Sequence, residues 1–384
     1  MPAQLDLPAI KALAVRTGRA LGAGDVRVAG AFGDDASYRR MVESFARGDL
    51  ATWGYDRQYA ARSTDPQTIL ENARSVVCVA FPYATPAPEA AGRLRGRVSN
   101  YAWSTDYHGR VRDTLGRIAA AVDAAAGEAV TAIACDTRPL AERAFAARSG
   151  LGWVGKHTNV IAPSLGSFVF LGEVVTTLEL PPDGPLRKQC GSCARCVDVC
   201  PTAALRGDYT IDATRCIADL TQRTDAIPRE MRALLGDWVW GCDLCQLACP
   251  PTQAAGSHAR PPEDPVEAET AVPSLIGLLH LRSGEFKRRF KKTAMGWRGA
   301  AVLRRNAAVA LGNALDRASI PALVLTLHED PHPMVRGHAA WALGRIGAPS
   351  ALSALRARYG VETDGGVLDE IRAALEPLAR ADHS

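Results

Sequence analysis

The sequence predicts an α+β protein of several domains: an α/β domain, a cysteine-rich module and a C-terminal domain of α-helical repeats. Three observations support this fold class. Apolar strand-like runs alternate with alanine-rich helical stretches over residues 1–180. Eight of the ten cysteines then fall within residues 181–260. Beyond them, over residues 261–384, a helical pattern recurs at a fixed offset. We take these three ranges as the domains.

The first domain is predicted to consist of alternating strands and helices. Runs of β-branched and apolar residues predict the strands Val76–Phe81, Val130–Cys135 and Phe168–Thr176. Apolar residues at helical spacing predict the helices Lys11–Leu21, Arg110–Ala126 and Leu140–Arg148. Such alternation is typical of an α/β layer domain, but it does not give the order of the strands.

A glycine motif at Gly150–Gly155 has the G-x-G-x-x-G spacing of a dinucleotide-binding fingerprint. That fingerprint follows a strand, opens a helix and has an acidic residue about 20 residues further on. Here the motif follows a predicted helix and the acidic residue is missing. We therefore expect the glycines to shape a loop whose backbone approaches a ligand closely. Lys156, His157 and Asn159 come next and could supply polar contacts to that ligand.

Asp136 is the carboxylate most suggestive of chemistry in this domain. It follows a predicted strand, and the ends of strands in open α/β sheets line ligand crevices. A partly desolvated carboxyl group there could act as a general acid near neutral pH. It could equally cap the helix that follows Pro139, so both roles stay open. A second polar cluster, Asp106–His108, precedes another predicted helix, where capping by Asp106 is the favoured role.

The cysteines form two runs with iron–sulfur spacing. The first is Cys190-x2-Cys193-x2-Cys196-x3-Cys200-Pro201, the bacterial ferredoxin pattern for a 4Fe–4S cluster. The second has the same ending, Cys242-x2-Cys245-x3-Cys249-Pro250, with Cys216 lying upstream. Eight thiolates suit two cubanes. Structural zinc sites are the alternative, which the three-cysteine run with a fourth cysteine before proline disfavours.

The ligands can be divided between the two clusters by the rule for two-cluster ferredoxins. In those proteins the fourth cysteine of each run serves the other cluster. Cluster one is then predicted to take Cys190, Cys193, Cys196 and Cys249. Cluster two is predicted to take Cys200, Cys216, Cys242 and Cys245.

A basic segment follows the cysteines, after a proline-rich linker at residues 251–273. Between residues 285 and 305, eight cations stand against Glu285 alone, with three aromatic residues between them. Such a patch suits a phosphate backbone and exposed bases, and a solvated helix face is the alternative. The candidate nucleic-acid contacts, including one cation further upstream, are Arg223, Lys287, Arg288, Arg289, Lys291, Arg304 and Arg305.

The last domain contains a sequence repeat. The pattern of residues 303–312 recurs 32 positions later at residues 335–344, and a further 32 positions reach Val367. Helix pairs with this pattern are HEAT-like repeats that stack into a small solenoid. Such repeats usually bind macromolecules and carry no chemistry.

The composition excludes several classes of protein. Of the 384 residues, 47% are hydrophobic, which excludes wholesale disorder, and the net charge of +4 says little about partners. No apolar run reaches membrane-spanning length. The N-terminus has neither a secretory pattern nor a twin-arginine pair. We therefore expect the protein to remain in a reducing cytoplasm, where thiolates stay available for iron.

Several segments together resemble the epoxyqueuosine reductases, the cobalamin-dependent iron–sulfur enzymes of queuosine-tRNA biosynthesis. The resemblance covers nearly the whole chain in the family's order. It is carried by residues 101–108, 135–143, 150–159, the two cysteine runs with 241–246, and 303–313. It implies an N-terminal cobalamin-binding domain resembling reductive dehalogenases, then a bacterial ferredoxin-like two-cluster module and HEAT-like repeats. Residues 218–223 and 251–252 depart from the family's pattern.

The resemblance also implies a reaction and its residues. Two electrons and two protons would remove the epoxide oxygen of epoxyqueuosine as water, leaving queuosine at the wobble position of tRNA. This is the last step of queuosine biosynthesis. Asp136 matches the family's proton donor. The matching cobalamin contacts are Arg57, His157, Asn159, Ser167, Gly241, Cys242, Asp243, Leu244, Cys245 and Gln246.

The implied partners are a tRNA anticodon stem-loop and an unidentified electron donor, and we expect a monomer. The alternative function is that of a cobalamin-dependent reductive dehalogenase-like enzyme acting on a small molecule. Such an enzyme would share both cofactors, but it would normally carry a twin-arginine signal and lack the repeats. A plain electron-transfer ferredoxin would leave the loop motifs of the first domain unexplained.

Overall fold

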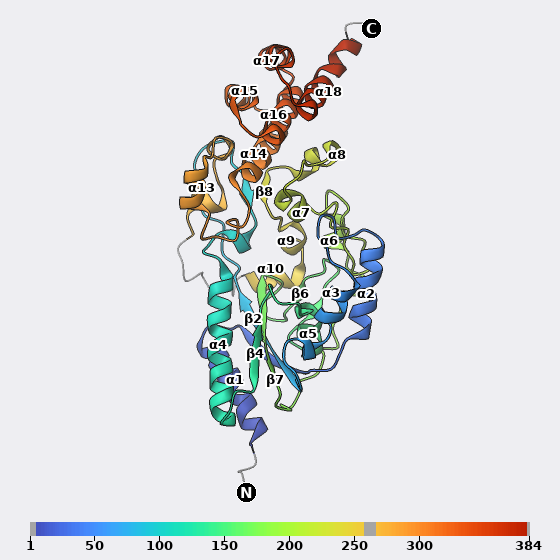
Figure 1. Cartoon of the computed structure of the whole chain (residues 1–384), viewed down its shortest axis with the longest axis vertical. Helices are drawn as coiled ribbons and strands as arrows, with labels where there is room; N and C mark the ends of the chain where they lie inside the picture. Colours follow the sequence, from blue (N-terminus) through green and yellow to red (C-terminus); the bar gives the residue numbers. More distant parts are fainter. Residues whose placement is uncertain (1–4, 257–265, 382–384) are drawn as a thin grey trace. The chain divides into compact units, whose positions relative to one another are not determined.

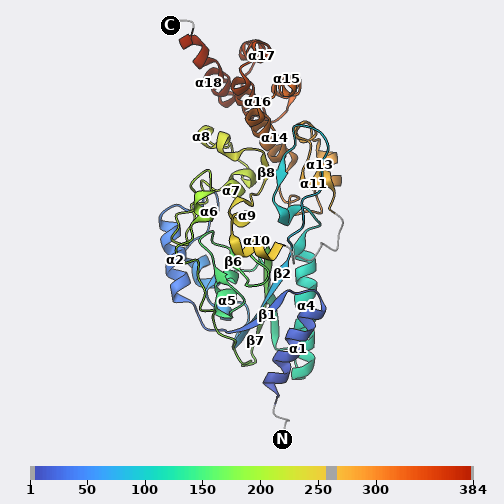
Figure 2. The same cartoon turned by 180° about the vertical axis from the view of Figure 1, so that it is seen from behind.

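The structure is a computed structural model that describes residues 5–256 and 266–381 (Figures 1 and 2). These residues form two compact units, and each unit is assembled from separate stretches of the chain. The first unit contains the described residues up to 85, residues 106–214 and the segment that begins at 244. The second contains residues 86–105, 215–243 and the described residues from 266 onward. The cysteine-rich segment therefore contributes to both units.

The first unit is built on a four-stranded sheet with the strand order β1-β2-β7-β4. The strands are β1 (Asp25–Gly30), β2 (Ser75–Pro82), β7 (Val169–Thr176) and β4 (Thr131–Ala134). Three of them match the predicted strands, whereas β1 was not predicted. Every neighbouring pair is antiparallel. The rule about crevices at the ends of parallel strands therefore does not explain the position of Asp136.

Helices cover both faces of this sheet. Val77 and Val79 of β2 pack against α1 (Leu7–Ala20) and α4 (Tyr107–Ala126) on one face. The alternate residues, such as Val76, pack toward α5 (Glu142–Arg148) on the other face. Figures 1 and 2 show α1 and α4 on one side of the sheet and α5 on the opposite side. Because both faces are covered, successive residues of β2 are buried on either side, and the strand is a continuous apolar run without the usual alternation of buried and exposed residues.

The glycine motif lies on a hairpin after α5. Its strands are β5 (Trp153–Val154) and β6 (Val160–Ile161), so the rejection of a dinucleotide fingerprint is confirmed. The expected close approach to a ligand stays a prediction, but the structure gives two of these glycines another reason to be small. A Cβ at Gly152 would lie 2.6 Å from the carbonyl oxygen of Ile161, and one at Gly155 would lie 2.9 Å from the His157 ring. These glycines make room for the protein's own chain.

Short elements complete the first unit. The loops before and after the sheet strands carry α2 (Asp35–Ala46), α3 (Arg57–Ser63) and η1 (Pro66–Thr68). The cysteine runs carry α6 (Arg195–Asp198), α9 (Leu244–Leu247) and α10 (Pro250–Gly256).

The second unit joins a small parallel strand pair to a helical solenoid. The pair is β3 (Arg97–Val98) and β8 (Trp238–Trp240). The helices around this pair are η2 (Asn100–Ala102), α7 (Ile217–Gln222), α8 (Arg229–Arg232), η3 (Ala233–Leu235), α11 (Ala268–Ala271), α12 (Leu275–Leu279) and α13 (Ser283–Arg289). The solenoid consists of α14 (Ala300–Ala314), η4 (Arg317–Ser319), α15 (Ile320–Glu329), α16 (Pro333–Ile346), α17 (Pro349–Tyr359) and α18 (Gly365–Ala381).

The repeated glycine explains how the solenoid stacks. Helices α14, α16 and α18 pack one on the next, with α15 and α17 beside them (Figure 1). A Cβ at Gly312 would lie 2.9 Å from Ala342, and one at Gly344 would lie 2.5 Å from Ala374. The glycine is thus needed at the same place in successive repeats, which confirms the repeat prediction. No helix among the described residues has the length and apolarity that crossing a membrane requires.

Candidate active site: a carboxyl-lined pocket in the first unit

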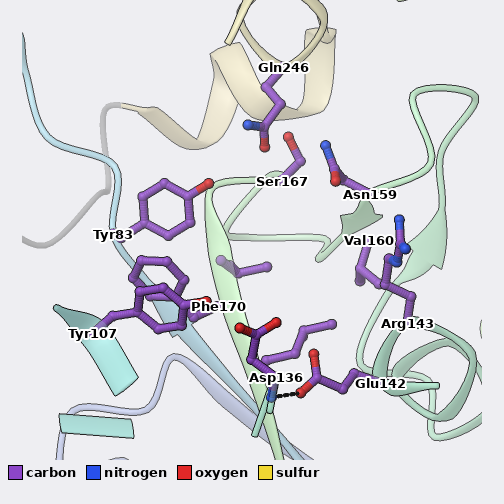
Figure 3. Close-up of a pocket in the computed structure, with 12 residues that line it drawn as sticks. Tyr83, Tyr107, Asp136, Glu142, Arg143, Asn159, Val160, Ser167, Phe170 and Gln246 are labelled. Carbon is purple, nitrogen blue, oxygen red and sulfur yellow. Dashed lines mark hydrogen bonds between the residues drawn. The ribbon is translucent and has the colours of Figure 1, made fainter. Parts of the chain in front are cut away.

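A cavity of about 280 Å³ opens within the first unit (Figure 3). Two kinds of polar side chain line it. Asp136 and Glu142 lie at one end, whereas Ser167, Asn159 and Gln246 lie at the other. Between the two ends, the lining residues are Tyr83, Tyr107, Arg143, Val160, Val169, Phe170 and Leu171.

Asp136 reaches this pocket from the loop that follows β4. Its backbone φ of +45° is a left-handed conformation that residues other than glycine rarely adopt. Helix α5 begins at Glu142 with Ala141 at its N-cap position, so Asp136 does not cap that helix. The capping alternative for Asp136 is therefore wrong. Asp106 does cap α4, as predicted, by accepting a hydrogen bond from the His108 backbone N–H.

His108 connects these two aspartates. Its Nε2 lies 2.8 Å from Asp136 Oδ2, and its Nδ1 lies 2.5 Å from Asp106 Oδ1. The hydrogen bond with Asp136 is the largest cause that raises the His108 pKa. The same bond lowers the pKa of Asp136, outweighing the burial that would raise it. The hydrogen bond with His108 therefore acts against the desolvation of Asp136, and the role of Asp136 as general acid stays a prediction.

Glu142 holds the backbone of Asp136 from the other side. Its Oε1 accepts a hydrogen bond of 2.5 Å from the Asp136 N–H (Figure 3). Burial raises the pKa of Glu142 to about 7. Glu142 occurs in one of the segments that resemble the family, but no role was predicted for it.

Glu173 is a second carboxyl group that sequence reasoning missed. It sits on β7 opposite Cys78, is fully buried, and neither of its carboxylate oxygens accepts a hydrogen bond within the described part of the chain. Burial raises its pKa well above the usual value, and the charge of Glu142 raises it further. A lone glutamate inside an otherwise apolar strand was the signal that could have found it.

The opposite end of the pocket presents uncharged polar groups. Ser167 is fixed there because its backbone N–H and its Oγ both lie 3.0 Å from Thr252 Oγ1. Gln246 comes from α9, and Asn159 comes from the β5–β6 hairpin. Thr252 is one of the residues that depart from the family pattern, and its buried hydroxyl supports Ser167.

Three of the predicted cofactor contacts, Asn159, Ser167 and Gln246, line this pocket, whereas His157 and Arg57 of the same unit do not. His157 is buried, and its Nδ1 accepts a hydrogen bond of 3.2 Å from the Asn159 N–H, so it supports Asn159 from behind. Burial lowers the pKa of His157 to about 4, which keeps the ring neutral. Arg57 is exposed at the start of α3.

Four thiols elsewhere in the same unit influence one another, although within the described residues no group of three or more histidine, cysteine or acidic side chains is arranged to hold a metal ion. Burial raises the pKa of Cys196, and the neighbouring thiols of Cys190 and Cys249 raise it further. Burial also raises the pKa of Cys249, Thr252 lowers it through hydrogen bonds, and Cys190 and Cys193 raise it. This mutual influence fits the predicted ligand set of cluster one. In that set the last cysteine of the second run joins the first three cysteines of the first run.

The remaining cluster cysteines are divided between the units. Cys200 and Cys245 belong to the first, whereas Cys216 and Cys242 belong to the second, so the ligand set of cluster two stays a prediction. Cys245 is adjacent in sequence to Gln246, which lines the pocket. The other two cysteines, Cys78 and Cys135, are buried in the sheet core, away from both runs.

The segment Gly241–Asp243 is organised inside the second unit. Gly241 has φ +64°, and its N–H donates a hydrogen bond of 2.9 Å to Thr221 Oγ1. Asp243 is buried and accepts hydrogen bonds from Ser99 Oγ at 2.5 Å and the Asn100 N–H at 2.7 Å. The predicted cobalamin contacts of Gly241, Cys242, Asp243 and Leu244 stay predictions.

The predicted nucleic-acid contacts fall into two groups. Arg305 is fully buried, and its guanidinium donates to the carbonyl oxygens of Leu220 and Arg223. Arg223 is itself buried and pairs with Asp219. Arg304 is paired with Asp330 at 2.6 Å, with only 12% of its side chain exposed. The prediction of a nucleic-acid contact is therefore wrong for Arg305. Arg223 and Arg304 are enclosed as well, because each of these arginines bonds to other groups of the second unit and stabilises it.

The other basic residues remain at the surface. Lys287, Arg288 and Lys291 are exposed on and just after α13. Arg289 is half-buried and pairs with Glu285 at 2.8 Å. Trp297 is 50% exposed, and the Arg298 guanidinium stacks 3.7 Å from its ring centre. A stacked arginine and an exposed indole provide a platform suited to a nucleobase.

Comparisons with known proteins bear on this site. Family models match residues 63–137 (epoxyqueuosine reductase QueG, DUF1730), 189–252 (4Fe-4S double cluster binding domain) and 299–376 (HEAT repeats). An epoxyqueuosine reductase of Bacillus anthracis is 36% identical over 331 residues, which cover 85% of this chain and 87% of the relative. This chain belongs to the epoxyqueuosine reductase family. The double-cluster match contains all eight predicted ligands, so the zinc alternative is set aside.

Solved structures of epoxyqueuosine reductases have the same fold. One crystal structure contains an epoxyqueuosine-modified tRNA-Tyr stem loop, is 31% identical and covers 97% of this chain and 99% of its own, with a TM-score of 0.90. A structure of the Bacillus subtilis enzyme has its catalytic aspartate loop swung out of the active site. It is also 31% identical, covers 97% of this chain and 99% of its own, and has a TM-score of 0.89. A catabolic reductive dehalogenase is 18% identical over 66% of this chain and 36% of its own, with a TM-score of 0.34.

Proposed function

We propose that this chain reduces epoxyqueuosine to queuosine at the wobble position of tRNA, using cobalamin and two 4Fe–4S clusters. The observation that supports this most is the pocket of the first unit. It combines a hydrogen-bonded His108–Asp136 pair with an opposite end of uncharged polar groups, one of which, Gln246, follows the predicted cluster ligand Cys245 in the sequence. Membership of the epoxyqueuosine reductase family gives the reaction.

The reaction requires a proton source at the epoxide oxygen. Two electrons and two protons convert the epoxide to an alkene and water, and a C–O bond breaks poorly when it must release an alkoxide. His108 holds one proton 2.8 Å from Asp136 Oδ2. Asp136 faces the pocket, so it can relay that proton from His108 to the oxygen, and His108 would then take up the second proton from solvent. Asp136 is thus the proposed proton donor, with His108 as its supply.

The polar end of the pocket fits the edge of a cobalamin. A cavity of about 280 Å³ suits a modified nucleobase but not a corrin ring as well. The side chains of Asn159, Ser167 and Gln246 offer amide and hydroxyl groups, which complement the amide groups that surround a corrin. Cobalamin, when bound, would supply electrons at the epoxide carbon, and the protein would supply position and protons. Gln246 follows Cys245, so an electron from cluster two would enter at this end.

The substrate tRNA would be held by the exposed cations of the second unit. Lys287, Arg288 and Lys291 can reach a phosphate backbone because their side chains lie at the surface. Trp297 with the stacked Arg298 offers a surface for an unpaired base. We further propose that the protein acts as a monomer in the cytoplasm and receives electrons from a separate donor.

The decisive experiment is conversion of a defined substrate. Protein purified anaerobically, loaded with iron and cobalamin, is mixed with an epoxyqueuosine-modified anticodon stem-loop and excess chemical reductant. Mass spectrometry of the digested nucleosides should show queuosine, and omission of cobalamin should abolish it. Unchanged epoxyqueuosine with fully loaded protein would refute the proposal. Halide release from halogenated phenols under the same conditions would favour the dehalogenase-like alternative.

A further inference from the structure

Asp136 faces the pocket from a backbone conformation that the chain must hold in place. A non-glycine residue at φ +45° costs on the order of 1 kcal/mol or more, so the surrounding contacts have to select it. Most hydrogen bonds of the loop are local, such as Thr137 N–H to the Cys135 carbonyl at 2.5 Å. Local bonds of this kind move with the loop and do not fix it to the rest of the unit.

Two backbone groups attach the loop to side chains or helices beyond it. At its far end the Ala141 N–H donates a hydrogen bond of 2.6 Å to the Ser63 carbonyl at the end of α3. At Asp136 itself, the N–H donates to Glu142 Oε1 at 2.5 Å. Glu142 is the first residue of α5, and its side chain reaches back across the loop (Figure 3). This contact fixes the backbone at the residue whose side chain meets the substrate.

We propose that Glu142 is a positioning residue, whose carboxylate holds the Asp136 N–H and thereby keeps the Asp136 carboxylate turned into the pocket beside His108. This inference rests on the proposed function and adds a residue to it. In the Bacillus subtilis relative, the catalytic aspartate loop has been observed swung out of the active site, so a loop of this family can leave its pocket.

The strength of this contact should depend on the charge of Glu142. An ionised carboxylate accepts a hydrogen bond about twice as strongly as a neutral acceptor. Burial raises the Glu142 pKa to about 7, so the carboxylate is increasingly ionised, and the contact strengthens, as the pH rises through about 7. The titratable and charged groups around Glu142 are Asp136, Arg143, His108, Tyr59, Glu173, Cys78 and Cys135.

The first test measures the loop without any substrate. Hydrogen–deuterium exchange of the cluster-loaded protein, resolved to single amides, compares wild type with Glu142→Gln and Glu142→Ala. The Asp136 amide should exchange at least tenfold faster in Glu142→Ala and by a smaller factor in Glu142→Gln. The Ala141 amide, which donates to Ser63, is the internal control and should be unaffected. Equal exchange at Asp136 in all three proteins would overturn the proposal.

The second test uses the pH dependence of single-turnover conversion with excess reductant. In the wild type, the rate should fall below about pH 7 as Glu142 becomes protonated. In Glu142→Gln, which keeps an acceptor oxygen but no charge, this fall should disappear and the rate at pH 8 should be about tenfold lower. Glu173→Gln is the matched control, because it removes a buried carboxyl group that accepts no hydrogen bond from Asp136, and it should keep the fall.

The two proposals fail in different ways. If the wild type converts no substrate, the proposed function is wrong, and the exchange experiment still tests the loop. If the wild type converts substrate, the role of Glu142 would be overturned when the fall in rate at low pH is kept in Glu142→Gln and lost in Glu173→Gln.

Discussion

His108 Nε2 and Asp136 Oδ2 are joined by a hydrogen bond of 2.8 Å, and this bond raises the pKa of the histidine while lowering that of the aspartate. Under the proposed function, this pair of residues would hold the proton needed for epoxide reduction. Asp106 holds the other ring nitrogen of His108, so the imidazole is oriented from both sides. In the proposed reaction these residues have two separate tasks, since His108 would store the proton and Asp136 would present it to the pocket.

Replacing Asp136 with asparagine should abolish most of the activity. The variant keeps a side chain of the same shape but cannot carry a carboxyl proton, so single-turnover conversion should fall by roughly 10²–10⁴. Because the Asp136 bond is the largest cause of the raised His108 pKa, that pKa should fall toward the ordinary histidine value. NMR titration of His108 and quantification of queuosine measure the two effects. If an iron-loaded Asp136→Asn protein converts substrate at the wild-type rate, the proton comes from another group.

Glu173 should make the protein less stable as the pH rises. Its folded pKa is raised above the usual 4.5, so the folded state keeps a proton that the unfolded state loses above that pH. The loss of stability, relative to Glu173→Gln, is at most about 1.4 kcal/mol per pH unit, and it begins near pH 4.5 and continues up to the raised pKa. Melting temperatures of cluster-loaded protein should therefore diverge in favour of Glu173→Gln between pH 5 and pH 8.

The control for this comparison is Glu179→Gln, which changes an exposed glutamate just beyond β7. Its melting temperature should follow that of the wild type at every pH. If the difference in melting temperature between wild type and Glu173→Gln stays constant from pH 5 to pH 8, Glu173 does not hold a raised pKa in the folded protein.

The cysteine assignment predicts distinct iron contents for single substitutions. Anaerobically purified wild type should contain about eight iron and eight sulfide, as two 4Fe–4S clusters require. Cys249→Ser should lose cluster one, because its thiol lies with those of Cys190, Cys193 and Cys196. Cys78→Ser and Cys135→Ser should keep the full iron content, since both lie in the sheet core. Loss of cluster two instead of cluster one in Cys249→Ser, judged by electron paramagnetic resonance, would contradict the assignment.

The exposed cations of the second unit should govern binding of tRNA. Combined replacement of Lys287, Arg288 and Lys291 with alanine should weaken binding and flatten its salt dependence. The log–log slope should change by up to about 0.9 for each duplex phosphate that the protein no longer neutralises. Arg356→Ala, which removes an exposed cation from α17, is the control and should leave the slope unchanged. An unaltered slope in the triple variant would exclude this surface from tRNA binding.

Arg305 gives a contrasting expectation within the same basic segment. Its guanidinium holds backbone carbonyl oxygens of α7 and of the residue that follows it, so Arg305→Ala should lower the melting temperature before it affects tRNA affinity. The number of cations in a sequence is therefore a poor guide to the number that reach a phosphate.

The sequence by itself determined the parts of this protein whose signals are local. Cluster chemistry follows from cysteine spacing, the solenoid follows from a 32-residue repeat with its glycine, and three of the four strands of the largest sheet follow from short apolar runs. In each case the physical cause acts between residues close in the chain or between equivalent residues of a repeat. Such causes leave a readable pattern of residue types.

Only the tertiary structure decided how distant residues combine into a site. It placed His108 against Asp136, brought Cys249 to the first cysteine run, and buried Glu173 and Arg305. The antiparallel order of the sheet strands likewise appeared only in the fold. The physical reason is that desolvation and hydrogen bonding depend on neighbours in space. They can turn an aspartate that the sequence marks as an acid into the partner of a histidine whose pKa it raises, and an arginine that it marks as a phosphate ligand into part of the core.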